Sequence, residues 1–179
     1  MLTVITLAAN AQKLPNVQKT SMYESADIKT NDKAAEWNNQ FQAYNKATNI
    51  YYTLANDDKN LYLIVQATDP GIINKILRGG VTFSINEAGK KNFKDAVSIT
   101  YPILKKNNRL FLNFSAKPEK VVAGVASEFT QIDSFVSLNN KRLAERSKLI
   151  RVTGIKGVDT LISVYNQDGI KATLSLIHI

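Results

Sequence analysis

The segment NIYYTLANDDKNLYLIVQATDP, residues 49–70, places amide and carboxylate side chains between two apolar runs. Asn56, Asp57 and Asp58 offer the oxygen atoms that a hard cation such as calcium prefers. Calcium takes about six to eight oxygen ligands, however, and only a few are present here. The same residue types cap their own backbone in tight turns. We therefore interpret the group as the tip of a hairpin, with a calcium site at Asp57 and Asp58 as the alternative.

Carboxylates are also the residues that could support catalysis, because two of them facing each other across a cleft can hydrolyse a glycoside. The candidates all lie near predicted turns: Asp57, Asp58, Asp69, Glu87 and Asp95. Nothing in the sequence places two of them across one cleft. The chain contains neither a Gly-x-Ser-x-Gly nucleophile elbow nor a phosphate-binding glycine loop. We predict no catalytic residues and no enzyme activity.

Aromatic rings beside amide groups are the chemistry of a sugar-binding surface. Tyr51, Tyr62 and Gln66 share one face of the two apolar runs, as a period of two requires. If that face is open, it offers such a surface; if it is covered, it is core, and Ile64 favours a covered face because it is costly to expose. Trp37 is the single tryptophan, and such a residue beside a strand more often packs than binds. The candidate carbohydrate-binding residues are Trp37, Tyr51, Tyr62 and Gln66.

Alternation in the two runs also predicts their register. Antiparallel partners on matching apolar faces must have residue numbers with an odd sum, because a slip of one residue exchanges the faces. We expect a four-residue connection, residues 56–59, that places Leu54 opposite Leu61, Tyr52 opposite Leu63 and Ile50 opposite Val65.

Other patterns predict further elements. Asp69, Pro70 and Gly71 indicate a break, and residues 72–80 a helical turn ended by glycines. Residues 81–85 and 97–101 predict a second hairpin that ends at Pro102. We expect a strand at 109–114, a helix at 117–135, a helical or irregular piece at 138–149, strands within 149–155 and 158–165, and a hairpin turn at 166–169.

The composition fits one globular domain, with 179 residues, 44% of them hydrophobic and 21% charged. The absence of cysteine excludes disulfides, thiolate metal sites and a lipid anchor on cysteine. The net charge of +8 comes from short, interrupted basic clusters without an aromatic nucleic-acid motif. We interpret these clusters as a solvated face and predict no nucleic-acid partner. No segment reaches the ~20 apolar residues of a membrane span, so we predict no integral membrane protein.

Both termini have features of their own. Residues 1–11 end in Ala9, Asn10 and Ala11 after an apolar run, which is typical of the end of a secretory signal peptide. A first strand, favoured by Val4 and Ile5, is the alternative. The last six residues, LSLIHI at 174–179, resemble the translation of a transposase adapter used in preparing sequencing libraries. We therefore expect a signal-peptide remnant at 1–11, an extended lead-in at 12–27, one incomplete domain at 28–173 and an adapter-derived tail.

The order of four segments resembles a known family. IKTNDKAAEW, YYTLANDDKNLYLIVQATD, ILRGGVTFSINEAGKKN and VTGIKGVDTLISVYNQDGIKA together are similar to exported bacterial β-sandwich proteins related to family 9 carbohydrate-binding modules and to the DOMON-like group, most of all the versions common in Bacteroidetes. The resemblance covers most of residues 28–173. It implies a non-catalytic, jelly-roll-like sandwich that binds sugar chain ends or, in some DOMON relatives, haem.

The chain departs from that pattern at the sugar clamp, because Trp37 matches the opening motif of the family and not its clamp. Haem normally takes His or Met as axial ligands, and Met22 and His178 are poor candidates, since the latter falls in the suspected tail.

We expect a mainly β protein, an antiparallel β-sandwich of jelly-roll or Ig-like type with a helical insertion around residues 117–149. The predicted function is a non-catalytic extracytoplasmic carbohydrate-binding-like module. The alternatives are an envelope structural or protein-interaction domain and, less favoured, a glycoside hydrolase accessory or haem-binding domain. No cofactor is predicted apart from the possible calcium.

Overall fold

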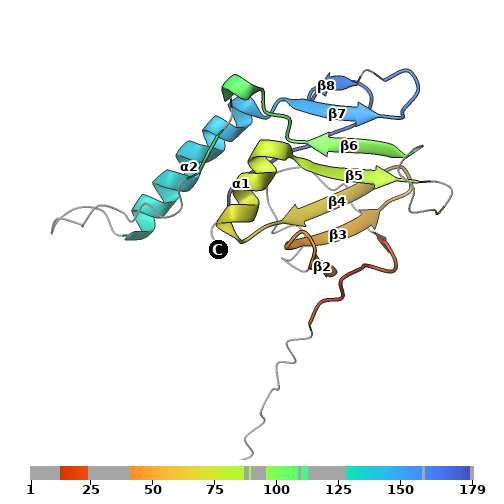
Figure 1. The fold of residues 1–179 in the computed structure, drawn as a ribbon, viewed down its shortest axis with the longest axis horizontal. Coiled ribbons are helices and arrows are strands. Elements are labelled where there is room, and N and C mark those ends of the chain that lie inside the picture. Colours follow the sequence, from red (N-terminus) through yellow and green to blue (C-terminus); the bar gives the residue numbers. More distant parts are fainter. Residues whose placement is uncertain are drawn as a thin grey trace, which may run out of the picture.

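The computed structural model describes residues 13–23, 41–86, 89, 96–108, 110–112, 128–158 and 160–177. Within them the fold is mixed α/β, with two α-helices and two four-stranded sheets, one mixed and one antiparallel, and neither sheet closes into a barrel (Figure 1). The expectation of two sheets with an inserted helix is confirmed at this level, whereas the expected mainly β class is wrong, because the described fold is mixed α/β. The expectation of purely antiparallel pairing is wrong for the first sheet, which contains a parallel pair.

Sheet A contains β1 (Met22–Tyr23), β2 (Ala43–Asn45), β3 (Ile50–Asn56) and β4 (Leu61–Gln66). The antiparallel partner β4 lies along one edge of β3, while β2 and the parallel strand β1 share the other edge. Between β1 and β2 the amide of Gln18 takes the place of a strand. It accepts from the Leu54 N–H at 2.7 Å and donates to the Leu54 carbonyl at 2.8 Å. The lead-in is therefore held along β3 as an extended segment.

The hairpin of β3 and β4 has a register that differs from the expected one. Leu54 lies opposite Leu63, and Tyr52 lies opposite Val65. Each predicted partner is therefore wrong by two residues, although the apolar faces still match. The turn comprises residues 57–60 because Asp57 starts it. The Asp57 N–H donates to the Asn60 carbonyl at 3.1 Å, and the Asp57 carboxylate accepts the N–H groups of Lys59 and Asn60 at 2.6 Å each.

The helix α1 (Pro70–Gly79) starts where the sequence predicts a break. Asp69 is its N-cap and accepts the Ile72 N–H at 2.8 Å, and Pro70 is tolerated at the first turn. Gly80 ends the helix as predicted, with a φ of 74°. A Cβ at Gly80 would lie 2.8 Å from the Pro102 carbonyl oxygen, so this position requires glycine.

Sheet B is antiparallel and contains β5 (Val81–Ile85), β6 (Val97–Tyr101), β7 (Leu149–Thr153) and β8 (Leu161–Ser163) in that order. The predicted hairpin of β5 and β6 is confirmed, with Phe83 opposite Ile99. One face of the sheet carries the buried side chains of Ile150, Val152 and Ile162. In β5 and β6 the other face carries small hydroxyl side chains, and the Thr82 and Thr100 hydroxyls hydrogen-bond at 2.9 Å.

The helix α2 (Glu128–Arg146) runs through the predicted boundary between 135 and 138, and residues 117–127 of the expected helix lie outside the described residues. Two asparagines inside α2 have low helix propensity, which favours a break there in the sequence. Both are satisfied in the structure. Asn139 donates to the Phe135 carbonyl at 2.9 Å, and Asn140 bonds to the backbone of Leu176. These contacts outweigh the intrinsic propensity.

The strand expected at 109–114 is absent from the described part of that range. Residues 110–112 and 170–177 carry no strand, although the turn at 166–169 forms, with the Asn166 carboxamide oxygen accepting the Asp168 N–H at 2.9 Å. A short 3₁₀ helix, η2 (Lys106–Asn108), precedes the first of these segments. Neither 110–112 nor 170–177 gains a backbone ladder; side chains of the helices bind them instead.

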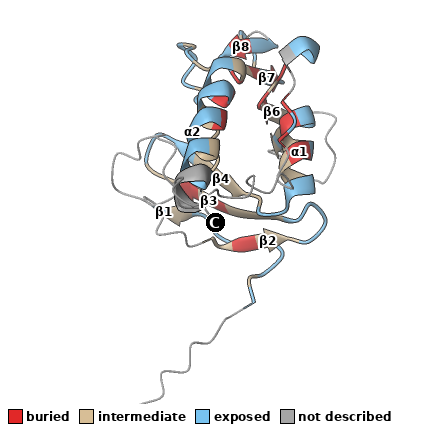
Figure 2. Cartoon of the chain, turned by 90° about the vertical axis from the view of Figure 1, so that its left-hand side faces the viewer, coloured by how far each residue is buried: buried red, intermediate tan, exposed pale blue. Residues whose placement is uncertain are grey.

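Asparagine side chains fix both irregular segments to the helices. Asn74 of α1 bonds to the N–H and the carbonyl of Leu112, both at 3.0 Å, and Asn140 of α2 bonds to those of Leu176 at 2.6 and 3.0 Å. The leucine cluster between them contains Leu77, Leu104, Leu110, Leu112 and Leu143, with Ile73, Leu174 and Leu176 packed against it. Figure 2 shows buried residues on α1, α2 and the strands of sheet B. Residues 174 and 176 of the predicted foreign tail thus contact this cluster.

Candidate functional site

Three aromatic rings gather where β2 meets β3. Tyr44 lies opposite Tyr51 in the register, and their ring centroids are 4.7 Å apart at an interplanar angle of 44°. The Phe41 ring also lies close to Tyr51, with a centroid distance of 5.8 Å and an interplanar angle of 46°. All three side chains are half-buried. We call Phe41, Tyr44 and Tyr51 the aromatic group.

The turn between β2 and β3 explains how these rings come together. The Asn45 carboxamide oxygen accepts the N–H groups of Ala47 at 3.0 Å and Thr48 at 3.3 Å, which is the local capping that favours asparagine in turns. Asn49 closes the turn with a φ of 55°. Its carboxamide oxygen accepts from the Tyr44 hydroxyl at 3.1 Å, so the turn also fixes the Tyr44 ring.

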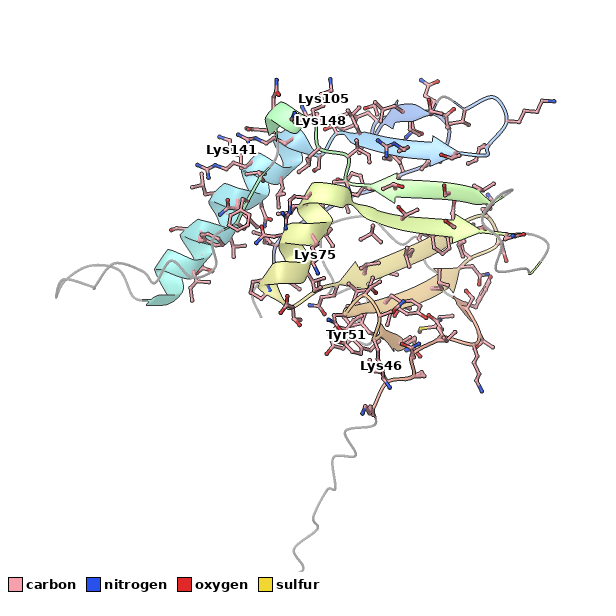
Figure 3. The ribbon with its side chains drawn as sticks, viewed as in Figure 1. Lys46, Tyr51, Lys75, Lys105, Lys141 and Lys148 are labelled. Carbon is pink, nitrogen blue, oxygen red and sulfur yellow. The ribbon has the colours of Figure 1, made fainter. Side chains whose placement is uncertain are left out.

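Polar groups surround the aromatic group. Gln66 of β4 lies opposite Tyr51, so its amide is on the same face of sheet A as the Tyr44 and Tyr51 rings. Lys46 is exposed in the β2–β3 turn, and Figure 3 shows it with Tyr51 at one end of sheet A. Half-exposed ring faces next to an amide that both donates and accepts can hold a ring that is apolar on its faces and polar at its edge.

The predicted residue Tyr62 belongs to the opposite end of the hairpin. Its hydroxyl donates to Asp57 Oδ2 at 2.6 Å and accepts from Asn60 Nδ2 at 3.2 Å. Tyr62 and Gln66 are four positions apart in β4, which is about 13 Å along a strand. Of the predicted aromatic residues, Tyr51 therefore lies with Gln66, and Tyr62 does not.

Asp57 is held at the hairpin tip by a dense set of donors. Besides the two backbone N–H groups, the Tyr62 hydroxyl donates to it at 2.6 Å and Asn60 Nδ2 at 3.0 Å. The hydrogen bonds from Tyr62 and Asn60 favour the charged form and hold the pKa of the Asp57 carboxyl well below its ordinary value. Asp58 accepts from the Tyr23 hydroxyl at 3.0 Å, which ties β1 to the same turn.

Through these contacts Asp57 and Asp58 stabilise the turn between β3 and β4. Among the described residues, no group of three or more His, Cys, Asp or Glu could hold a metal ion. Asp69, a third carboxylate named above, caps α1. Glu87, Asp95 and the candidate Trp37 lie outside the described residues.

Phe41 and Tyr44 are absent from the sequence-based candidates, although the sequence holds a signal for them. The letters AYNKATNIYY contain two short runs with aromatic residues around a turn rich in asparagine. A four-residue connection there places Tyr44 opposite Tyr51 by the same argument that was used for the next hairpin. Phe41 precedes β2 and carries no such signal.

Compared with family models, with curated proteins and with solved structures, the chain matches none of them. No helix in the described part of the chain is both long and apolar enough to cross a membrane.

Proposed function

We propose that this protein is a non-catalytic carbohydrate-binding module, with the aromatic group and Gln66 as its binding surface. The contact geometry of Phe41, Tyr44 and Tyr51 carries the proposal, because three rings meet on one side of a sheet end beside an amide. Sugar rings present C–H groups on their faces and hydroxyls at their edges. Aromatic faces suit the former, and the Gln66 amide suits the latter.

The half-burial of these rings supports the same proposal. Fully buried rings belong to a core, whereas these three are packed against one another and still reach solvent. Mutual packing also lowers the entropy that a side chain loses when a ligand orders it, which favours binding. The exposed ammonium of Lys46 lies within the same turn and adds a donor at the rim.

In this proposal the two sheets form a jelly-roll-like sandwich, and the protein acts outside the cytoplasm. Sheet B has the buried side chains of Ile150, Val152 and Ile162 on one face, as a layer packed on a second layer requires. The signal-like residues 1–11 support export.

A glycan-array screen of the labelled protein tests the function, followed by titration of each bound glycan with intrinsic tryptophan fluorescence. We expect saturable binding, and we expect Tyr51→Ala to weaken it at least about tenfold, which corresponds to ~1.4 kcal/mol. Gln66→Ala should weaken it through loss of hydrogen bonds.

Tyr165→Ala is the matched control, because this tyrosine is 75% exposed in the turn after β8 and lies outside the aromatic group. Its binding should equal that of the wild type. If a folded wild-type protein binds no glycan, or if Tyr51→Ala binds as the wild type does, the proposal is wrong. The first of these results would favour an envelope structural or protein-interaction domain.

A further inference from the structure

We infer that a second surface, formed by the loop after β6 and the C-terminal half of α2, docks on an anionic lipid bilayer. The basic surface consists of Lys105, Lys106, Lys141, Arg142 and Lys148, all exposed. Phe111, from the same loop as Lys105 and Lys106, is 71% exposed. This inference is independent of the proposed sugar site, which lies on sheet A.

The packing of the leucine cluster brings these residues together. Leu104 and Leu110 come from the loop and Leu143 from α2, and the three are buried in one cluster. The Ile103 N–H donates to the Leu149 carbonyl at 3.1 Å, which joins the loop to the segment that carries Lys148. Figure 3 shows Lys105 and Lys148 together at the upper end of α2, with Lys141 further along that helix.

Charge is the first feature that selects the partner. Residues 141–148, KRLAERSK, hold four basic residues and one acidic residue, Glu145. The basic residues follow a helix and a neighbouring loop, and their long side chains can reach a plane of headgroups. Anionic lipids attract clustered Lys and Arg side chains at a bilayer surface, with a strength that falls as salt rises.

Phe111 is the second feature, because a large apolar side chain that is mostly exposed needs a partner. Its neighbours Leu110 and Leu112 are buried, and Asn74 fixes the Leu112 backbone, so Phe111 is held pointing away from the core. A rigidly presented ring in the loop that also carries Lys105 and Lys106 suits the interface between headgroups and acyl chains. A single ring does not form the row of stacking platforms that single-stranded nucleic acid uses.

Sedimentation with vesicles tests the inference. We expect the protein to sediment with vesicles of phosphatidylcholine and phosphatidylglycerol, to stay in solution with pure phosphatidylcholine, and to be released by added salt. The double variant Lys105→Glu/Lys106→Glu should bind at least about tenfold more weakly. Phe111→Ala should lower the affinity about tenfold through loss of buried apolar area.

Two matched controls separate this surface from net charge and from general hydrophobicity. Lys13→Glu/Lys19→Glu makes the same change in charge on the exposed lead-in, and Tyr165→Ala removes an exposed ring elsewhere. Both should bind vesicles as the wild type does. Equal losses in the controls and in the surface variants would overturn the inference. So would an absence of sedimentation with anionic vesicles, or binding only to a single-stranded oligonucleotide.

Discussion

Sheet A and sheet B bury different kinds of side chain. In sheet B the buried strand residues include Ile150, Val152 and Ile162, and partly buried apolar residues pack around them. In sheet A the fully buried strand residues are small, namely Ala43, Thr53 and Ala55, while the aromatic rings remain half-exposed. Sheet B thus carries a branched apolar core, and sheet A keeps its large rings at the surface.

This difference separates the residues that stabilise the fold from those that can serve as a binding surface. Buried branched side chains contribute in proportion to the area removed from water. Half-exposed rings contribute less to folding and keep free area for a ligand. Substitutions in sheet B should therefore lower the free energy of unfolding, and substitutions in the aromatic group should mainly lower affinity.

The largest effect is expected for Ile150→Ala, which removes a fully buried side chain of β7. We expect a loss of about 2–5 kcal/mol in the free energy of unfolding, measured by urea titration. Leu161→Ala is the control in the neighbouring strand, because Leu161 is 46% exposed, and its cost should stay below about 1 kcal/mol. Similar costs for both variants would remove the basis for placing the core in sheet B.

Asn74→Ala tests how residues 110–112 are held, since they pair with no strand of either sheet. The substitution leaves the buried N–H and carbonyl of Leu112 without their partner, at an expected cost of about 2–3 kcal/mol. Hydrogen exchange at the Leu112 amide should also accelerate. Asn139→Ala removes a bond within α2 only and should cost less. If hydrogen exchange at the Leu112 amide were unchanged in Asn74→Ala, the role assigned to Asn74 in holding the Leu112 backbone would be contradicted.

Adjacent glycines before β5 provide a third test. Gly80→Ala introduces a Cβ at positive φ, 2.8 Å from a carbonyl oxygen and 2.9 Å from Thr100, and should destabilise the protein by about 1–3 kcal/mol. A Cβ at Gly79 meets nothing within 4 Å, and this residue is helical, so Gly79→Ala should stabilise by up to about 1 kcal/mol. Thermal melts of the two variants should shift in opposite directions. A common direction would contradict the described end of α1.

Tyr51→Ala is expected to cost only about 1 kcal/mol in the free energy of unfolding, because the ring is half-buried. Urea titration beside Ile150→Ala gives the direct comparison. A cost as large as that of Ile150→Ala would mean that the aromatic group is core, and the sugar-binding proposal would lose its support.

The smallest effect concerns the hairpin tip of sheet A. Because the pKa of Asp57 is lowered in the folded state, its carboxylate contributes stability above the ordinary pKa of an aspartate, and that contribution is lost as the pH falls through the lowered value. Asp57→Asn should therefore lower the melting temperature near neutral pH and reduce the difference between neutral and acidic solution. Melts recorded across the acidic range measure this. A variant with the wild-type acid dependence would assign that dependence to other groups.

Alternation along strands was sufficient to predict much of sheet B and the faces of the β3–β4 hairpin. Its exact register was not predictable, because Asp57 and Asn56 are equally good turn residues, and only the bonds from Lys59 and Asn60 select the start of the turn. Segments 110–112 and 170–177 have strand-like composition but no strand partner. Their place is set by Asn74 and Asn140, whose long-range contacts leave no periodic pattern in the sequence.

The candidate site was predictable in part for the same reason. Tyr51 and Gln66 follow from alternation within one hairpin. The position of Phe41 depends on how the chain enters β2, which the sequence does not indicate. Tyr62 was misplaced because two residues on the same face of a strand can still lie far apart along it.

Amide chemical-shift mapping of the ¹⁵N-labelled protein with a glycan from the array tests the central claim most directly. The account predicts that the shifts that change on binding belong to residues 41–51 and to Gln66, at the aromatic end of sheet A. Changes confined to the hairpin tip at residues 57–62, or to the basic surface of α2, with the aromatic group unaffected, would contradict it.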